Sequence, residues 1–175
     1  GFVPFEEMPF LYNPDKGYIA TANNKIVDDD YPYYISNQWA EPSRIERIEE
    51  WLESKEKLTV EDMKTLQNDW LSPFAREVVP NIVEWLPQGL NKNEITALNI
   101  LNDWDYIEDK ESAAALIFHT VLDELLHNIY EDELAMIDDK AFDALVHFSM
   151  LPYRNIHWVL AEGLSSWVDD VTTPD

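Results

Sequence analysis

The spacing of apolar residues changes near residue 41. Residues 1–40 have no helical period and carry prolines at positions 4, 9, 14 and 32, each of which interrupts a helix. From residue 41 onward, apolar residues return every three or four positions, which is the period of an amphipathic helix. The pattern predicts a mainly α protein, with residues 1–40 as an extended arm and residues 41–175 as an orthogonal cluster of several helices.

Start and stop signals divide the second region into helices. Thr59 begins a sequence typical of a capping box, and Ser72 before Pro73 is typical of a capped helix start. Pro80 is expected to kink or divide the helix that follows Pro73, because proline lacks an N–H and clashes with the preceding turn. The predicted helices start at Ser43 (capped by Ser43 or Glu41), Thr59, Ser72 and Asn93, and later ones cover about 110–131, 138–151 and 155–168.

The arm contains a segment that alternates in the manner of a strand. Asn13 to Gly17 have the composition of a turn, and residues 18–23 (YIATAN) then alternate large and small side chains. A strand needs a partner strand for its backbone groups. We therefore expect the sheet to belong to another part of a longer polypeptide, and an unpaired strand also favours self-association through the arm.

Composition excludes several classes of function. The chain has 35 acidic and 12 basic residues, and a net charge of −23 repels nucleic acids and anionic membrane surfaces. It has no cysteine, so thiol nucleophiles, disulfides and cysteine-based zinc sites are excluded. Hydrophobic residues make up 46% of the chain, enough for a folded core.

Two clusters of side chains suggest other chemistry. His119, Asp123 and His127 share one helix face and could hold zinc, although apolar neighbours favour packing at the core or its rim. Four glutamates could include a glycosidase-type carboxylate pair, although a solvated helix face explains them better. These glutamates are Glu46, Glu49, Glu50 and Glu53. Tryptophans on apolar stripes are expected in the core: Trp39, Trp51, Trp70, Trp85 and Trp104.

Motifs of the first 70 residues point to a family. They are PFEEMP (4–9), NPDKGYIATANN (13–24), DYP (30–32), WAEPSR (39–44) and KLTVED (57–62), followed later by LNDWD (101–105) and SAAALIFH (112–119). In this order and spacing the chain resembles the penicillin amidase family, which includes penicillin acylases and acyl-homoserine-lactone acylases. The resemblance implies an N-terminal-nucleophile hydrolase, in which a serine attacks an acyl amide and its own α-amine acts as the base.

The resemblance also implies roles for three residues. Asn23 matches the asparagine whose side-chain NH₂ stabilises the oxyanion, whereas without the resemblance it would be interpreted as a turn residue. Arg44 matches an arginine that supports the site, either by fixing Asn23 or by binding a substrate carboxylate, and its alternative is an ion pair with a nearby acid. Ala22 is small where some members have an aromatic residue, so we expect an altered acyl pocket.

No cofactor is predicted for this chain. Members of the family often bind calcium through an aspartate after DYP, but YYISNQW follows here and has no aspartate. The acids of 28–30 lack the alternation of a calcium loop, so a solvated loop is the better interpretation. No metal ligand is assigned.

The chain also lacks the expected nucleophile. Gly1 has no side chain to attack with, and in the family the serine lies upstream of the PFEEMP-type segment. We expect an internal piece of the large catalytic chain that is inactive alone, is completed by the rest of the acylase, and acts on a small acyl amide. The resemblance implies an extracellular or periplasmic location. A stand-alone acidic interaction module, with its arm folded against its own helices, is the alternative.

Overall fold

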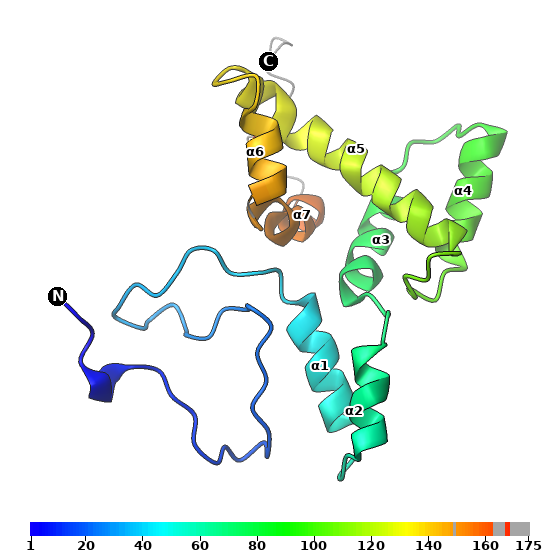
Figure 1. Ribbon diagram of the computed structural model, residues 1–175. Coiled ribbons are helices and arrows are strands. Elements are labelled where there is room, and N and C mark those ends of the chain that lie inside the picture. Colours follow the sequence, from blue (N-terminus) through cyan, green and yellow to red (C-terminus); the bar gives the residue numbers. More distant parts are fainter. Residues whose placement is uncertain (149, 163–166, 169–175) are drawn as a thin grey trace.

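The computed structural model describes residues 1–148, 150–162 and 167–168 of the chain. Within them the protein is mainly helical and contains no β-strand, which confirms the predicted fold class at that level (Figure 1). The elements are η1 (Phe5–Glu7), α1 (Ser43–Glu53), α2 (Val60–Gln67), α3 (Pro73–Trp85), α4 (Lys92–Asn102), α5 (Ala113–Ala135), α6 (Ala141–Phe148) and α7 (Leu151–Glu162). No helix in these ranges is long and apolar enough to cross a bilayer.

Helices α1, α2 and α3 begin where the sequence predicts, whereas α5 and α6 begin three residues later than predicted and α7 begins four residues earlier. Residues 163–166 of the last predicted helix lie outside the described residues. Thr59 forms a complete capping box with Asp62, and the Ser72 hydroxyl accepts from the Ala75 N–H at 3.2 Å. The predicted start of α4 at Asn93 lies one residue after the observed start at Lys92 and two residues after the N-cap. Asn91 is the N-cap, because its side-chain oxygen accepts from the N–H groups of Asn93 and Glu94.

Helix α3 continues through Pro80 without being divided. The proline removes one backbone donor, but Val78, Val79 and Ile82 around it are buried against the core. Packing on this face therefore keeps both halves in one helix. The helix ends at Trp85, shortly before Pro87.

The core lies between α3, α4, α5 and α7. Phe118 of α5 is fully buried and meets the rings of Phe74 and Trp104 at centroid distances of 6.0 and 5.6 Å. The prediction that the tryptophans are core residues holds for Trp104 but is wrong for Trp70 and Trp85, which are 50% and 59% exposed. Trp85 is the last residue of α3, and Trp70 lies three residues after the end of α2.

The arm has almost no regular structure. Apart from η1, residues 1–42 contain no helix, and residues 18–23 form no ladder with another described segment. The isolated bridge pairs Leu71 with Ile107 instead. A strand at 18–23 is therefore not formed in the described chain, because it has no partner here, and the sheet in a longer polypeptide stays a prediction. The domain boundary near residue 40 likewise stays a prediction.

Helix α1 stands between the arm and the other helices. Figure 1 shows the arm in blue beside α1, with α2 and α3 on its other side. Only Ser43 and Ile45 of α1 are buried, and no residue of α1 belongs to the core cluster formed by the described residues. Helix α1 is thus attached to the core rather than part of it.

Candidate functional site

Residues 16–23 of the arm lie antiparallel to α1. At one end, the Tyr18 hydroxyl donates to Glu53 Oε1 at 2.6 Å and Lys16 Nζ lies 2.7 Å from Glu49 Oε1. At the other end, Arg44 contacts the backbone and side chain at residues 22–23. The lengths match, since five extended steps span about 16 Å and nine helical steps span about 14 Å. Contacts at both ends of α1 therefore determine where residues 16–23 lie.

Asn23 adopts a backbone conformation that suits asparagine. Its φ is +60°, in the left-handed region that few residues other than glycine and asparagine adopt readily. Its carbonyl oxygen accepts from the Ala40 N–H at 2.9 Å, which ties the turn to the start of the WAEPSR segment. The next asparagine, Asn24, accepts from the Ala22 N–H at 3.0 Å through Oδ1. The NN pair thus forms a fixed turn whose first side chain is exposed.

Arg44 determines which way the Asn23 carboxamide faces. One guanidinium nitrogen, Nη2, donates to Asn23 Oδ1 at 2.9 Å and to the Ala22 carbonyl oxygen at 2.8 Å. Because a guanidinium can only donate, the amide atom that faces it must be the oxygen. The Asn23 NH₂ then points away from Arg44, and no acceptor from the described residues occupies it. The alternative, an ion pair of Arg44 with an acid, is not formed among the described residues, where Arg44 donates to Asn23 and Ala22.

Ala22 is buried, and its contacts with Arg44 and Asn24 are made by backbone atoms. A cavity of about 1390 Å³ lies nearby, bounded by residues 18–21, α1, α2, residues 69–74 and α7. Its walls include the side chains of Arg44, Trp70 and Tyr153, but not that of Ala22. The prediction that Ala22 shapes an acyl pocket therefore stays a prediction.

The N-terminus of α1 is capped by the predicted acid. Pro42 occupies the N-cap position and has no side chain that could cap. Glu41 Oε1 accepts from the Ser43 N–H at 2.7 Å, and Glu41 Oε2 accepts from the Ser43 hydroxyl. This carboxylate satisfies a free N–H of the first turn, the turn that carries Arg44.

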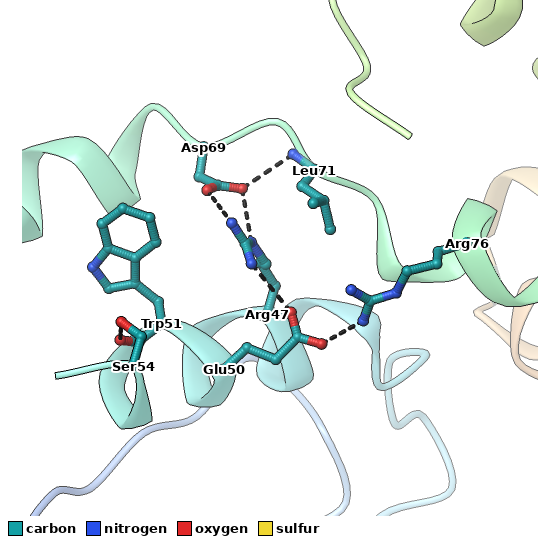
Figure 2. Close-up of polar contacts among 7 residues, drawn as sticks. All are labelled: Arg47, Glu50, Trp51, Ser54, Asp69, Leu71 and Arg76. Carbon is teal, nitrogen blue, oxygen red and sulfur yellow. Dashed lines mark hydrogen bonds and ion pairs between the residues drawn. The ribbon is translucent and has the colours of Figure 1, made fainter. Parts of the chain in front are cut away.

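A charged network fixes the middle of α1. Arg47 donates through Nε to Asp69 Oδ1 at 2.9 Å and through Nη2 to Asp69 Oδ2 at 2.6 Å, a bidentate pair (Figure 2). Arg47 also lies 3.1 Å from Glu50, whose other oxygen accepts from Arg76 of α3. The hydrogen bonds that Arg47 donates to Asp69 hold the pKa of Asp69 below its ordinary value and raise the pKa of Arg47. Sequence reasoning missed this network, because no local spacing relates residue 47 to residue 69.

The alternative zinc site is not assembled. His119 Nε2 lies 3.4 Å from Glu108 and His127 Nδ1 lies 3.2 Å from Glu131, so each histidine has a different carboxylate partner. Asp123 is exposed. No group of three potential metal ligands gathers among the described residues.

The acidic face of α1 is not simply solvated. Glu49 and Glu53 hold the arm, and Glu50 joins the network with Arg47 and Arg76. Burial raises the pKa of Glu46, with repulsion from neighbouring acids as a second cause. In the loop at 28–30, the prediction of a solvated acid agrees with the structure, where Asp29 is exposed and pairs with Lys25.

Comparison with known proteins places these features in a family. The family described as penicillin amidase matches residues 1–175. The acyl-homoserine lactone acylase QuiP of Pseudomonas syringae pv. tomato is 27% identical over 187 aligned residues, which cover 99% of this chain and 23% of that protein. No solved structure gives a significant match.

Two penicillin acylases match shorter regions at higher identity. The penicillin acylase 2 proenzyme of a Pseudomonas species is 41% identical over 75 residues, covering 43% of this chain and 10% of that protein. Penicillin G acylase of Escherichia coli is 40% identical over 63 residues, covering 35% of this chain and 7% of that protein. The chain therefore spans less than a quarter of the length of each of these relatives.

Proposed function

Because the chain belongs to the penicillin amidase family, we propose that it is part of an acylase and that Asn23 stabilises the oxyanion of the acyl-transfer step. The relatives are named as acylases of penicillins and of acyl-homoserine lactones. The proposed substrate class is accordingly a small N-acyl amide, penicillin-like or an acyl-homoserine lactone, and the bond cleaved is the amide of the acyl side chain.

The contact between Arg44 Nη2 and Asn23 Oδ1 is the observation that carries this proposal. An oxyanion needs donors that are already oriented before charge develops. Arg44 holds the oxygen of the carboxamide, so the two N–H groups of Asn23 face the other way with no acceptor from the described residues. The positive φ of Asn23 and its backbone bond to Ala40 hold the side chain at the surface.

Arg44 contributes to this role in two ways. Donation to Oδ1 draws electron density from the amide and makes its N–H groups stronger donors. The guanidinium also places a positive charge beside the developing negative charge. Among the described residues its hydrogen bonds go to two neutral oxygens, so no carboxylate cancels that charge.

The remaining chemistry is assigned to other parts of a longer polypeptide. An N-terminal serine attacks the acyl carbonyl, and its α-amine, with an ordinary pKa near ~8, takes the proton. The tetrahedral oxyanion then accepts hydrogen bonds from the Asn23 N–H groups. Its collapse breaks the C–N bond while the α-ammonium returns its proton to the leaving nitrogen, and water then hydrolyses the acyl-serine ester to the free acid and the serine. Export to the periplasm or the medium, and completion of the site by the rest of the acylase, are parts of the same proposal.

The test uses the full-length enzyme that contains this chain. Asn23→Ala is expected to lower kcat for a phenylacetyl or fatty-acyl anilide by about 10²–10³, the usual loss for one oxyanion donor. Asn23→Asp is expected to lower it further, because a carboxylate pairs with Arg44 but repels the oxyanion. Asn128→Ala, on the exposed face of α5, is the matched control and should retain activity.

Two results would contradict the proposal. One is an Asn23→Ala enzyme with unchanged kcat and an unchanged fold. The other is turnover of the same anilides by the 175-residue chain alone, which we expect to be inactive because it lacks the serine and its α-amine.

The alternative function, an acidic interaction module, gains one supporting observation. Residues 16–23 do contact a helix of the same chain, as that hypothesis expects. The two proposals differ in the consequence of losing Asn23: a module would lose binding to a partner protein, whereas an acylase loses turnover with its fold intact.

A further inference from the structure

The position of Arg44 depends on how α1 is held. Arg44 lies in the first turn of α1, and Arg47 lies three residues later, so both project from neighbouring points on the same helix. A shift or rotation of α1 would carry Arg44 away from the arm and would release Asn23 Oδ1. The attachment of α1 to the rest of the protein therefore bears directly on the orientation of the proposed oxyanion donor.

Apolar packing fixes α1 only weakly. Two of its eleven residues are buried, and none belongs to the core cluster of the described chain. By contrast, α3 places five residues in the buried set and is part of that core. Hydrophobic contact is non-directional and does not by itself define the rotation of a helix.

The Arg47–Asp69 pair supplies a directional attachment. Its two parallel N–H···O bonds define both distance and orientation, as bidentate pairs do. The side chains of Arg47 and Asp69 are 22% and 12% exposed, so solvent screens this pair less than it screens an exposed pair such as Lys64–Glu61, at 62% and 78%. Asp69 Oδ1 also accepts from the Leu71 N–H at 3.1 Å, which fixes the carboxylate in turn.

A second connection joins α1 to the core through Glu50, which also pairs with Arg47. Figure 2 shows the Arg47 guanidinium between Asp69 and Glu50, with Arg76 of α3 reaching the far oxygen of Glu50. Arg76 lies between the buried residues Ala75 and Val78 in sequence, so the chain of contacts ends on a rigid helix. Helix α1 is thus held to residues 69–71 through Arg47 and to α3 through Glu50, and the bond between Arg47 and Glu50 links the two attachments.

We propose that Arg47 is a positioning residue of the acylase site: its paired bond to Asp69 sets α1 so that Arg44 orients the Asn23 carboxamide. This inference rests on the proposed function of Asn23. Nothing in the arrangement brings Arg47 or Asp69 into contact with Asn23, so their effect is transmitted through α1 and Arg44.

The test is a mutant cycle in the full-length enzyme with a phenylacetyl or fatty-acyl anilide. Asp69→Asn removes one charge and one strong acceptor at nearly constant volume. It is expected to lower kcat about tenfold with little change in KM, below the ~10² that a misplacement of 1 Å can cost. Arg47→Lys should lower kcat by a similar or smaller factor. The lysine keeps the positive charge, but its ammonium cannot form the two parallel hydrogen bonds of the guanidinium.

The cycle separates positioning from general destabilisation. If the pair acts through the donor, Asp69→Asn should have little further effect on kcat in an Asn23→Ala background, because coupled sites are non-additive. The same cycle is run in an Arg44→Lys background, because Arg44→Lys is expected to retain more activity than Asn23→Ala. Glu61→Gln, which breaks the exposed pair of Glu61 with Lys64 on α2, is the matched control and should leave kcat unchanged.

The outcomes distinguish the two proposals. If Asn23→Ala leaves kcat unchanged, the oxyanion proposal fails, and the positioning proposal fails with it. If Asn23→Ala lowers kcat but Asp69→Asn lowers it by the same factor in both backgrounds, or only lowers the melting temperature, the positioning proposal alone is overturned. Both proposals are supported if Asp69→Asn lowers kcat in the wild-type enzyme but causes little additional loss in the Asn23→Ala and Arg44→Lys enzymes.

Discussion

The arm and the helical core differ in the burial of their apolar side chains. In the core, Phe118, Leu126 and Ile156 are less than 2% exposed. In the arm, Phe2, Phe5, Phe10 and Tyr12 are 79% or more exposed, although they are of the same residue class. The helices therefore complete their own core, whereas the apolar surface that would cover the arm is not supplied by the described residues.

The two regions also differ in what holds them. Helices α3–α5 and α7 are held by burial, while residues 16–23 are held by hydrogen bonds and ion pairs to α1, most of them exposed. Exposed pairs contribute little to stability. The polar contacts therefore orient the candidate donor without adding much to the free energy of unfolding.

The largest expected effect is a test of this contrast in stability. Phe118→Ala should lower the free energy of unfolding of the chain by about 3–5 kcal/mol, through lost burial and a cavity in the core. Phe10→Ala, at 79% exposure, is the matched control and should change it by no more than about 0.5 kcal/mol. Chemical denaturation measures both. Equal losses would mean that the arm is packed against the core and would remove the contrast.

A smaller effect concerns the attachment of α1. Asp69→Asn is expected to lower the free energy of unfolding by about 1.5–3 kcal/mol at neutral pH, the range for hydrogen bonds to charged groups. The pKa of Asp69 is below its ordinary 3.8 in the folded chain, so its contribution is complete above about pH 4.

This contribution should disappear in acid. As the pH falls through the folded pKa, Asp69 is protonated in both states, and the difference between wild type and Asp69→Asn should shrink. Denaturant titrations at a series of pH values measure it, with Glu61→Gln as the exposed control. A difference that is independent of pH would contradict an ionised Asp69 as the source of the stabilisation.

The smallest effect probes the far end of the arm. The hydrogen bond to Glu53 raises the pKa of Tyr18 to about 12, since ionising the phenol would remove the donor beside a carboxylate. The contact is complete below the ordinary value near 10 and is lost as the pH rises through about 12. Glu53→Gln should return the Tyr18 pKa toward its ordinary value.

Nuclear magnetic resonance of ring-labelled tyrosine follows this titration, and Tyr18→Phe identifies the signal. A Tyr18 pKa that is the same in wild type and Glu53→Gln would show that the arm does not rest on α1 at this end.

Local sequence predicted the helices well because their signals are local. Thr59, Ser72 and Ser112 cap helices through bonds to residues three positions away, and such spacing is visible in the sequence. Where contacts of longer range decide, the local signals were incomplete or wrong. Pro80 stays inside α3, where its neighbours are buried, and Trp70 and Trp85 are half-exposed although they fall on apolar stripes.

The candidate site was predicted in part. The motifs named Asn23 and Arg44, and the structure brings the two into contact. They did not indicate Arg47 and Asp69, which are 22 residues apart and acquire their relation only when α1 folds against the segment after α2. Ala22, predicted at the acyl pocket, is buried with its backbone in use, and its effect on a pocket is untested.

The amino-acid sequence by itself determined the change from arm to helices, the caps, the family motifs and the identity of the amide and guanidinium at the site. Those properties depend on residue type and on spacings of a few positions. The tertiary structure alone decided that Arg44 holds the oxygen of Asn23 rather than its nitrogen, and that α1 is tied down through Arg47. These depend on atoms far apart in the chain, whose distances are set by the packing of helices and not by the order of residues.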